Sequence, residues 1–352
     1  MSAIRIGLDE AGLGPTLGPL VIGGLATRER ESGGHDELRR RLAAVIAEPP
    51  CRDGRLEVGD SKAIHQGTRK LERLERTALA TIVWLYGELP THVGALFDRV
   101  LVREFEQPED RRAPWWRALD ERLPLVGERD DLLAAGERLR EAGEREGVEP
   151  LWYRADLIDA ARVNRELDDE HQRVDGTKNT WSTHAVLRMA ALARRELASP
   201  RTIVACDMAG GRRSYDGALR RAFALPPASG EVGLFDAASA GSSPGSSPGS
   251  ITVLGEAREA SRYRLDLPGG PVELAFLVGG DRLDPRISWG SILAKYLREL
   301  LMRPFNRHFA ARVPGLRPTA GYPEDARRFI ADVEARLGES GGLERAAWIR
   351  SK

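Results

Sequence analysis

The sequence predicts an α/β fold, because short apolar runs typical of strands alternate along the chain with longer patterns typical of helices. The strand-like runs cover residues 4–8, 202–206 and 272–280. The helical patterns cover residues 69–79, 176–197 and 288–308, the last with a break expected at Pro304. An acidic residue follows each strand-like run, namely Asp9 with Glu10, Asp207 and Asp281. Strand ends are therefore where we expect a functional site.

The first strand-like run ends in two adjacent carboxylates, Asp9 and Glu10, just before a glycine-rich bend that contains Gly12 and Gly14. Adjacent side chains on a regular strand point to opposite faces. We therefore expect both carboxylates to serve one site only if the strand ends or bulges at this point.

The stretch L-E-V-G-D-S-K at residues 56–62 runs into the helical pattern of residues 69–79. Ser61 and Lys62 are thereby predicted to lie on a loop or a first helical turn, where they are suited to holding a phosphate. The run at residues 202–206 repeats the order of apolar strand, acid and glycine bend, with Asp207 followed by Gly210-Gly211. Asp216 is the nearest alternative to Asp207.

The third acid, Asp281, precedes an amphipathic helical pattern, and Asp284 is its nearest alternative. Lys295 and Arg298 lie three residues apart on one face of that helix, beside an apolar stripe expected to be core. This basic pair is predicted to be either a solvated face or a phosphate contact.

Composition excludes several classes of protein. The 352 residues carry 53 basic and 53 acidic side chains, so the chain has no global electrostatic attraction to nucleic acid and would need local patches. No run is long and apolar enough for a membrane span, and no signal peptide is visible. Two cysteines, Cys51 and Cys206, make a disulfide framework improbable and fit the cytoplasm.

Two segments differ from the alternating strand and helix pattern. Residues 86–157 are expected to form a charged helical subdomain, with helical patterns at residues 100–105 and 129–142. In it, Trp115 and Trp116 are favoured as packing anchors over a base-stacking role. Residues 239–250, which contain G-S-S-P-G-S-S-P-G-S, are expected to be a disordered linker.

Four motifs in this order resemble ribonuclease HII, the type 2 ribonuclease H family. They are D-E-A-G-L-G-P at residues 9–15, D-S-K at residues 60–62, G-D-x5-I-x3-S-I-x-A-K-x2-R at residues 280–298, and G-Y at residues 321–322. The combined order is specific, whereas each motif alone is not.

The resemblance implies a ribonuclease H-like mixed central sheet flanked by helices, with a catalytic core at residues 1–85 and 158–303 and a helical region at residues 304–352. It implies a catalytic, metal-binding set of Asp9, Glu10, Asp207 and Asp281. It also implies substrate contacts from Gly12, Leu13, Gly14, Ser61, Lys62 and Tyr322, to which the pattern of the long helix adds Lys295 and Arg298.

Such a carboxylate cluster calls for cations, because two carboxylates about 4 Å apart repel by roughly 4 kcal/mol at an effective dielectric constant of about 20. Oxygen ligands alone favour two Mg²⁺ or Mn²⁺ ions. The expected activity is metal-dependent cleavage of the RNA strand of an RNA–DNA hybrid, or cleavage at a ribonucleotide embedded in duplex DNA.

The chain departs from the family pattern at two places, and these keep alternatives open. Leu13 stands where the family has an arginine between two glycines, and Thr319-Ala320 replace the lysine or histidine usual before the G-Y pair. The alternatives are a nuclease of the same fold with a different nucleic acid substrate, and a nucleic-acid-binding module without catalysis.

Overall fold

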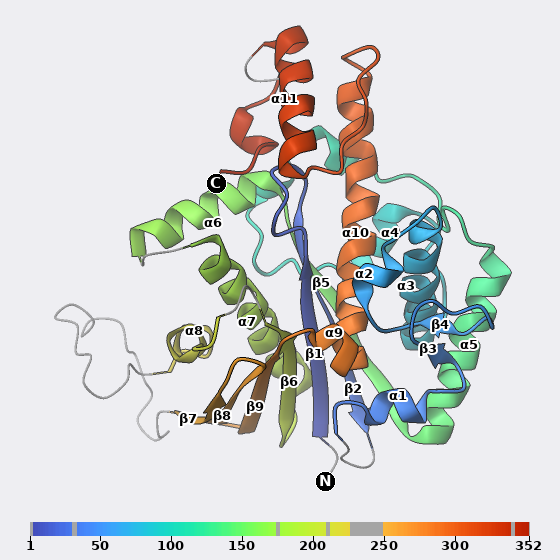
Figure 1. Cartoon of the computed structure of the whole chain (residues 1–352), viewed down its shortest axis with the longest axis vertical. Helices are drawn as coiled ribbons and strands as arrows, with labels where there is room; N and C mark the ends of the chain where they lie inside the picture. Colours follow the sequence, from blue (N-terminus) through green and yellow to red (C-terminus); the bar gives the residue numbers. More distant parts are fainter. Residues whose placement is uncertain are drawn as a thin grey trace.

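The computed structural model describes residues 3–29, 34–173, 177–208, 212–225, 249–338 and 342–351. It is a mixed α/β structure in which helices cover both faces of a central sheet (Figure 1), so the predicted fold class is confirmed. Most of the predicted linker at residues 239–250 and the pair Gly210-Gly211 lie outside the described residues.

Seven strands form the central sheet, in the spatial order β5-β2-β1-β6-β9-β8-β7. Their bounds are β1 Ala3–Ala11, β2 Leu20–Glu29, β5 Val148–Ile158, β6 Thr202–Asp207, β7 Ser250–Glu256, β8 Ala260–Leu267 and β9 Gly270–Leu277. The three central strands β1, β6 and β9 are parallel, and the outer strands on each side are antiparallel to their neighbours. The C-terminal ends of β1, β6 and β9, which are far apart in the sequence, therefore lie side by side at one edge of the sheet.

Two hydrophobic clusters hold helices on the two faces of the sheet. One face is covered by α3 (Lys70–Tyr86), α4 (Val93–Val100), α5 (Arg129–Glu146) and α10 (Pro285–Ala310), and the other by α7 (Lys178–Leu197) and α8 (Asp216–Ala222). The remaining helices are α1 (Glu37–Arg41), α2 (Ser61–Ile64), α6 (Ala160–Arg173), α9 (Gly280–Leu283) and α11 (Pro323–Leu337). Strands β3 (Ile46–Ala47) and β4 (Leu56–Glu57) form a separate two-stranded sheet. Among the described helices, none combines the length and the apolarity that crossing a membrane requires.

Helix α10 lies directly on the backbone of β1 and β2 because glycines remove the side chains between them. A Cβ atom added to Gly23 would lie 2.1 Å from the carbonyl oxygen of Gly290, and one added to Gly7 would lie 2.3 Å from the backbone of Arg286. This close approach brings the next turns of α10 to the acidic end of β1.

The expected break of this helix at Pro304 is wrong, because α10 continues to Ala310. Proline removes one backbone donor from the helix. Beyond it, Phe305 and Phe309 pack in an aromatic cluster with Trp115, at ring distances of 4.9 and 6.2 Å. Burial of these rings outweighs the lost hydrogen bond, so the expected helical region from residue 304 onward begins inside α10.

The segment at residues 86–157 is only partly helical. It holds α4, α5 and two short 3₁₀ turns, η1 (Pro108–Arg111) and η2 (Pro114–Arg117), but its last residues form strand β5, which pairs with β2 in the central sheet. Pro150 and the charged residues of β5 interrupt the apolar alternation that indicates a strand, so this strand is not evident from the sequence. The helical pattern expected at residues 100–105 is wrong as well, because α4 ends at Val100.

The two tryptophans of this segment are anchors, as favoured from the sequence. Trp115 is 1% exposed and Trp116 is 9% exposed, and both indole Nε1 atoms donate to Oδ2 of Asp159 at 2.8 Å. A base-stacking role would need an exposed ring, and neither tryptophan presents one.

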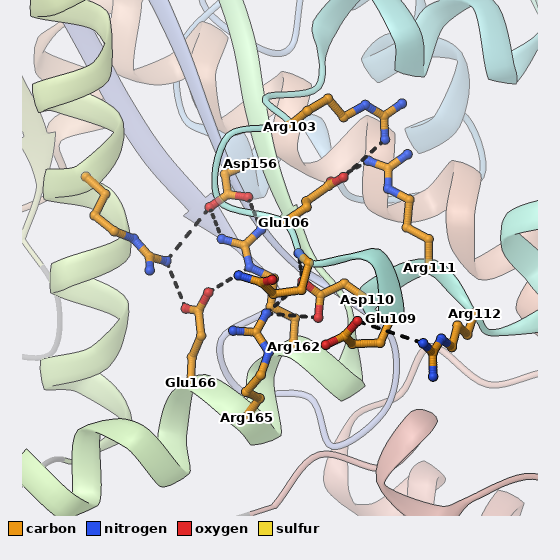
Figure 2. A network of polar contacts seen from close by, with 12 residues as sticks. Arg103, Glu106, Glu109, Asp110, Arg111, Arg112, Asp156, Arg162, Arg165 and Glu166 are labelled. Atoms are coloured by element: carbon orange, nitrogen blue, oxygen red, sulfur yellow. Dashed lines mark hydrogen bonds and ion pairs between the residues drawn. The ribbon is translucent and has the colours of Figure 1, made fainter.

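A network of charged side chains fastens the loop around η1 to α6 (Figure 2). Arg162, which is wholly buried, donates to both oxygens of Asp156 at 2.5 and 2.9 Å and to Glu166 at 2.7 Å. Arg165 donates to both oxygens of Asp110 in η1 at 2.9 and 2.7 Å. The network ties helix, strand and loop together on the face of the sheet that carries α7.

Candidate functional site

The register of the central strands brings the three predicted acidic positions together. Leu8 of β1 pairs with Cys206 of β6, and Asp207 pairs with Leu277 of β9. Asp9 therefore lies at the level of Asp207, and Asp281 follows four residues after the end of β9. Parallel strands place these carboxyl ends at one edge of the sheet.

An open cleft of about 800 Å³ lies at this edge. Its walls include all four predicted catalytic acids, Asp9, Glu10, Asp207 and Asp281, and six of the eight predicted substrate contacts, Gly12, Ser61, Lys62, Lys295, Arg298 and Tyr322. Leu13 and Gly14 do not line it.

Asp9 faces α10 and is 8% exposed. Burial, and after it the charge of Glu10, raise the pKa of Asp9 well above its usual value, whereas Lys295 and the hydroxyl of Ser291 act in the opposite direction. A carboxylate with few counter-charges in a buried position favours a proton or a cation.

Glu10 reaches the same cleft without the strand break expected from the sequence. Its pairing with β2 is regular through Ala11, but the pairing of β1 with β6 stops at Leu8. Burial, and then the charge of Asp207, raise the pKa of Glu10 to about 7. Glu10 therefore reaches the cleft because β6 no longer pairs with β1 beyond Leu8, and no bulge is needed.

Asp207 is the last residue of β6, and its Oδ1 accepts a hydrogen bond from the amide of Gly280 at 2.7 Å. Burial raises the pKa of Asp207, with a further upward contribution from Asp281. The alternative Asp216 instead accepts a hydrogen bond from Arg220 at 2.7 Å and does not line the cleft.

Asp281 is held by the loop that carries D-S-K. The amide and the hydroxyl of Ser61 both donate to Oδ2 of Asp281, at 2.9 and 2.6 Å. The alternative Asp284 caps α10 through the amide of Arg286 at 3.0 Å and also accepts from the guanidinium of Arg286 at 2.9 Å. Asp284 therefore has a structural role.

Two further contacts lock the same loop against α9 and α10. Arg282 donates to Oδ2 of Asp60 at 2.6 Å, and the hydroxyl of Ser288 bonds both the amide and the carbonyl of Gly59 at 2.8 Å. Oδ1 of Asp60 accepts from the amides of Lys62 and Ala63, which begins α2 at this point. The motifs at residues 60–62 and 280–298 thus form one unit.

Two lysines supply positive charge to the acidic cleft. Lys295 donates to Oγ of Ser291 at 2.7 Å, and burial lowers its pKa, against the raising effects of Asp9 and Asp281. The charge of Lys62 acts to lower the pKa of Asp207. Both ammonium groups lie where they could balance the carboxylates or meet a phosphate.

Arg298 lines the cleft, and its guanidinium is engaged by backbone carbonyl oxygens. It is 7% exposed and donates to the carbonyl oxygens of Ala320 at 2.7 Å and Leu17 at 3.3 Å. Its guanidinium lies 5.9 Å from the ring centre of Tyr322, which is 54% exposed at the cleft. Arg298 therefore holds together the two backbone segments, at Leu17 and Ala320, that lie next to Tyr322 in the cleft wall.

The loop after β1 depends on glycine where it meets Arg298. Gly12 has φ +89°, and a Cβ atom there would lie 2.7 Å from Nε of Arg298. Leu13, which stands in place of a family arginine, is half-buried against the cluster that includes Ile4 and Ile6 of β1. Gly14 is exposed, with open space around its Cα.

His65 and Glu299 form one wall of the cleft, and neither is among the site residues predicted from the sequence. Nε2 of His65 lies 2.9 Å from Oε1 of Glu299, which also accepts from Lys70 at 3.3 Å. Their separation in sequence leaves no spacing signal that could have paired them. The helical spacing of Glu299 from Lys295, four residues apart, is the one available clue.

The donor chemistry of the cleft fits hard divalent cations, because its acids are carboxylates with raised pKa values and no arginine pairs with Asp9, Glu10 or Asp207 among the described residues. Within the same described ranges, no three His, Cys, Asp or Glu side chains are already grouped as ligands of an ion. The four carboxylates line one cleft, but their side chains are not arranged around a common position that an ion could occupy.

No protein-family model matches the sequence, and no curated protein matches it. Solved structures similar to this chain are ribonucleases HII, H2 and HIII. A chain of the PCNA:RNase HII complex from Archaeoglobus fulgidus is 13% identical over 99% of this chain and 94% of that chain, with a TM-score of 0.41. The ribonuclease H2 from Pyrococcus horikoshii OT3 is 12% identical over 97% and 92%, with a TM-score of 0.35.

Bst-RNase HIII in complex with Mn²⁺ is 12% identical over 99% of this chain and 66% of that chain, with a TM-score of 0.36. The sequence motifs resemble ribonuclease HII, and one of these solved structures is a complex that contains a ribonuclease HII.

Proposed function

We propose that this chain is a metal-dependent endonuclease that cleaves the RNA strand of an RNA–DNA hybrid or cuts duplex DNA at an embedded ribonucleotide. The observation that carries the proposal is the convergence of Asp9, Glu10, Asp207 and Asp281 on one cleft, where burial and mutual repulsion raise the pKa values of the first three. A fold gains no stability from such a cluster, so the cluster points to chemistry.

The four carboxylates are the proposed ligands of two Mg²⁺ or Mn²⁺ ions. When bound, such ions supply a nucleophile at neutral pH and stabilise the negative charge that develops on a phosphodiester. Ser61 holds Asp281 in place through two hydrogen bonds, and the amide of Gly280 holds Asp207. This support fixes two of the four ligands before any ion arrives.

The remaining residues of the cleft are assigned to the nucleic acid. Lys62 lies at the start of α2, next to the acids, where its ammonium can contact a phosphate. The exposed ring of Tyr322 can stack on a sugar or base, with Arg298 fixed beneath it. Gly12 in the cleft wall and Gly14 just beyond it are assigned backbone-amide contacts, which bind phosphates without regard to sequence.

A second candidate is a nuclease of the same site with a different nucleic acid substrate. The half-buried position of Leu13 favours it, because an apolar side chain packed on the core cannot replace a cationic contact to a strand. The metal site is unaffected by this difference, since Leu13 does not line the cleft.

Three matched duplexes, of DNA, of RNA–DNA and of DNA with one ribonucleotide, test both candidates. In the presence of Mg²⁺ or Mn²⁺, the protein is expected to cleave at least one of the two ribose-containing duplexes. Asp9→Asn or Asp281→Asn is expected to abolish this cleavage and to leave the melting temperature of the protein unchanged. Cleavage of the DNA duplex or of structured RNA instead would select the second candidate. Binding without cleavage would leave a non-catalytic module, and full activity in either variant would refute the assigned site.

A further inference from the structure

Residues 342–351 form a strap that crosses the loop at residues 12–18, here called the glycine loop. Ile349 makes an isolated antiparallel bridge with Leu17, and the amide of Arg350 donates to the carbonyl oxygen of Thr16 at 3.0 Å. The strap therefore follows the glycine loop along its backbone.

Two residues outside the loop fix the position of the strap. Asn164 of α6 donates to the carbonyl oxygens of Ile349 at 2.8 Å and Ala346 at 2.9 Å. Trp348 is fully buried, with its ring 4.8 Å from that of Phe309 in α10. These contacts deliver the side chain of the next residue, Arg350, to the inner side of the glycine loop.

The guanidinium of Arg350 joins the two ends of this loop. Nη1 donates to the carbonyl oxygen of Gly12 at 2.6 Å, and Nε donates to that of Gly18 at 2.7 Å. Arg350 is 2% exposed, so these hydrogen bonds are made away from water. Arg298 reaches the carbonyl oxygen of Leu17 within the same loop.

The direction of a held carbonyl fixes the direction of the next amide, because the two point opposite ways across a planar trans peptide. The carbonyl of Gly12 points toward Arg350, so the N–H of Leu13 points away from it. Among the described residues, no hydrogen-bond partner is recorded for the amides of Leu13 and Gly14. The glycine loop thus turns the carbonyl oxygens of Gly12 and Gly18 toward Arg350, and the amides of Leu13 and Gly14 remain available to another molecule.

Asp159 is the acidic residue whose charge acts on the buried guanidinium of Arg350. Burial, and after it the charge of Arg298, lower the pKa of Arg350 to about 9, and the charge of Asp159 acts against that change. Asp159 is itself held by the indoles of Trp115 and Trp116.

We propose that Arg350 is a positioning residue for nucleic-acid binding: it holds the glycine loop in the form whose free amides receive a phosphate of the bound strand. The inference rests on the proposed function, because it takes the bound strand to extend from the cleft, at Gly12, over the adjoining residues Leu13 and Gly14. It predicts that Arg350 controls affinity for the strand and leaves the metal-dependent step unchanged.

The test compares Arg350→Gln and Arg350→Lys with the unaltered protein on a labelled RNA–DNA duplex. Equilibrium binding is measured by fluorescence anisotropy with EDTA present, so that no cleavage occurs, and KM and kcat are then measured with Mg²⁺ or Mn²⁺. Arg350→Gln removes charge-assisted hydrogen bonds, and we expect Kd and KM to rise about tenfold with kcat within about threefold. Arg350→Lys is expected to fall between, because an ammonium cannot span both carbonyls.

Arg345→Ala is the matched control, since Arg345 lies in the same strap and pairs with Glu334 of α11 away from the glycine loop. Its Kd, KM and kcat are expected to stay within about twofold, the range of a surface pair. Hydrogen exchange of the amides at residues 13–18 adds a readout that needs no nucleic acid, and Arg350→Gln is expected to raise their exchange rates.

Unchanged Kd in Arg350→Gln, or a loss confined to kcat, overturns the inference while the nuclease proposal stands. If that variant does not fold, Arg350→Lys decides, and an unchanged Kd in it has the same meaning. If the unaltered protein binds none of the three duplexes, the proposed function itself fails, and the inference fails with it.

Discussion

Ser61 and Asp281, 220 residues apart in the sequence, are joined by two hydrogen bonds to one carboxylate oxygen. The backbone donor would survive a change of side chain, and the hydroxyl donor at 2.6 Å would not. The pair connects the loop at residues 60–62 to an acid of the proposed metal site. A substitution at Ser61 therefore tests that site without changing any of its proposed ligands.

Ser61→Ala is expected to weaken divalent metal binding about 10-fold to 100-fold, the usual effect of losing a group that orients a ligand. Isothermal titration with Mn²⁺ measures the change. Ser199→Ala is the control, because Ser199 bonds the carbonyl of Arg201 near the start of β6 and does not line the cleft. Equal affinities in the two variants would show that Asp281 does not depend on Ser61.

The pKa of Glu10 predicts a pH dependence in the metal-free protein. Its pKa is about 7 in the folded chain against 4.5 as the ordinary value, because burial and then Asp207 disfavour its charged form. The folded state then holds a proton that the unfolded state releases, so the free energy of unfolding should fall as pH rises from about 4.5 to about 7. Thermal denaturation in EDTA between pH 5 and 8 measures this slope.

Metal binding needs the deprotonated carboxylate, so added Mg²⁺ should stabilise the protein more at pH 8 than at pH 6. Glu10→Gln should flatten the slope in EDTA. A slope of the same size in Glu10→Gln would assign it to another group.

Gly23→Ala tests the close packing of α10 on the sheet. The added Cβ would meet the carbonyl oxygen of Gly290 at 2.1 Å, so backbone must move, at an expected cost of about 1–3 kcal/mol in the free energy of unfolding. Urea denaturation measures the loss. Gly217→Ala in α8, where nothing lies within 4 Å, should instead be neutral or stabilise the protein by up to about 1 kcal/mol.

Arg162→Met tests the buried charge network of Figure 2. The change leaves Asp156 without its two hydrogen bonds from the guanidinium in a wholly buried position, which is expected to cost about 3–5 kcal/mol of unfolding free energy. Arg112→Met is the control, because its contact to Glu109 is 3.9 Å long and exposed. A loss below about 1 kcal/mol in Arg162→Met would show that the network is dispensable.

Tyr322→Ala should raise KM for a nucleic acid duplex about tenfold and leave the melting temperature nearly unchanged, since the ring is 54% exposed. Tyr322→Phe keeps the ring and should retain most of the affinity. An unchanged KM in Tyr322→Ala would place the bound strand elsewhere in the cleft.

The parts of the site that could be predicted from the sequence are those with a local signal. Asp9, Asp207 and Asp281 each follow an apolar run, and a strand end is visible in a few residues. The topology then places the three ends together because β1, β6 and β9 are parallel neighbours. Their roles as ligands remain proposals.

Other parts depend on contacts that leave no local pattern. Strand β5 contains Pro150 and charged residues, and it becomes a strand because β2 offers an edge. Pro304 stays inside α10 because aromatic rings beyond it are buried together. Arg350 meets Gly12 across 338 positions of the chain, and arginine is too common here for its position to stand out.

Helix α10 places Lys295, Arg298 and Glu299 on the wall of the cleft, and Ser291, one turn earlier, accepts a hydrogen bond from Lys295. Each residue of an α-helix advances the side chain by about 100° around the axis. Inserting or deleting a single residue between Gly290 and Glu299 would therefore swing all later side chains out of alignment at once, whereas a substitution alters only one of them. Where it lines the cleft, this helix should tolerate substitutions far better than insertions or deletions.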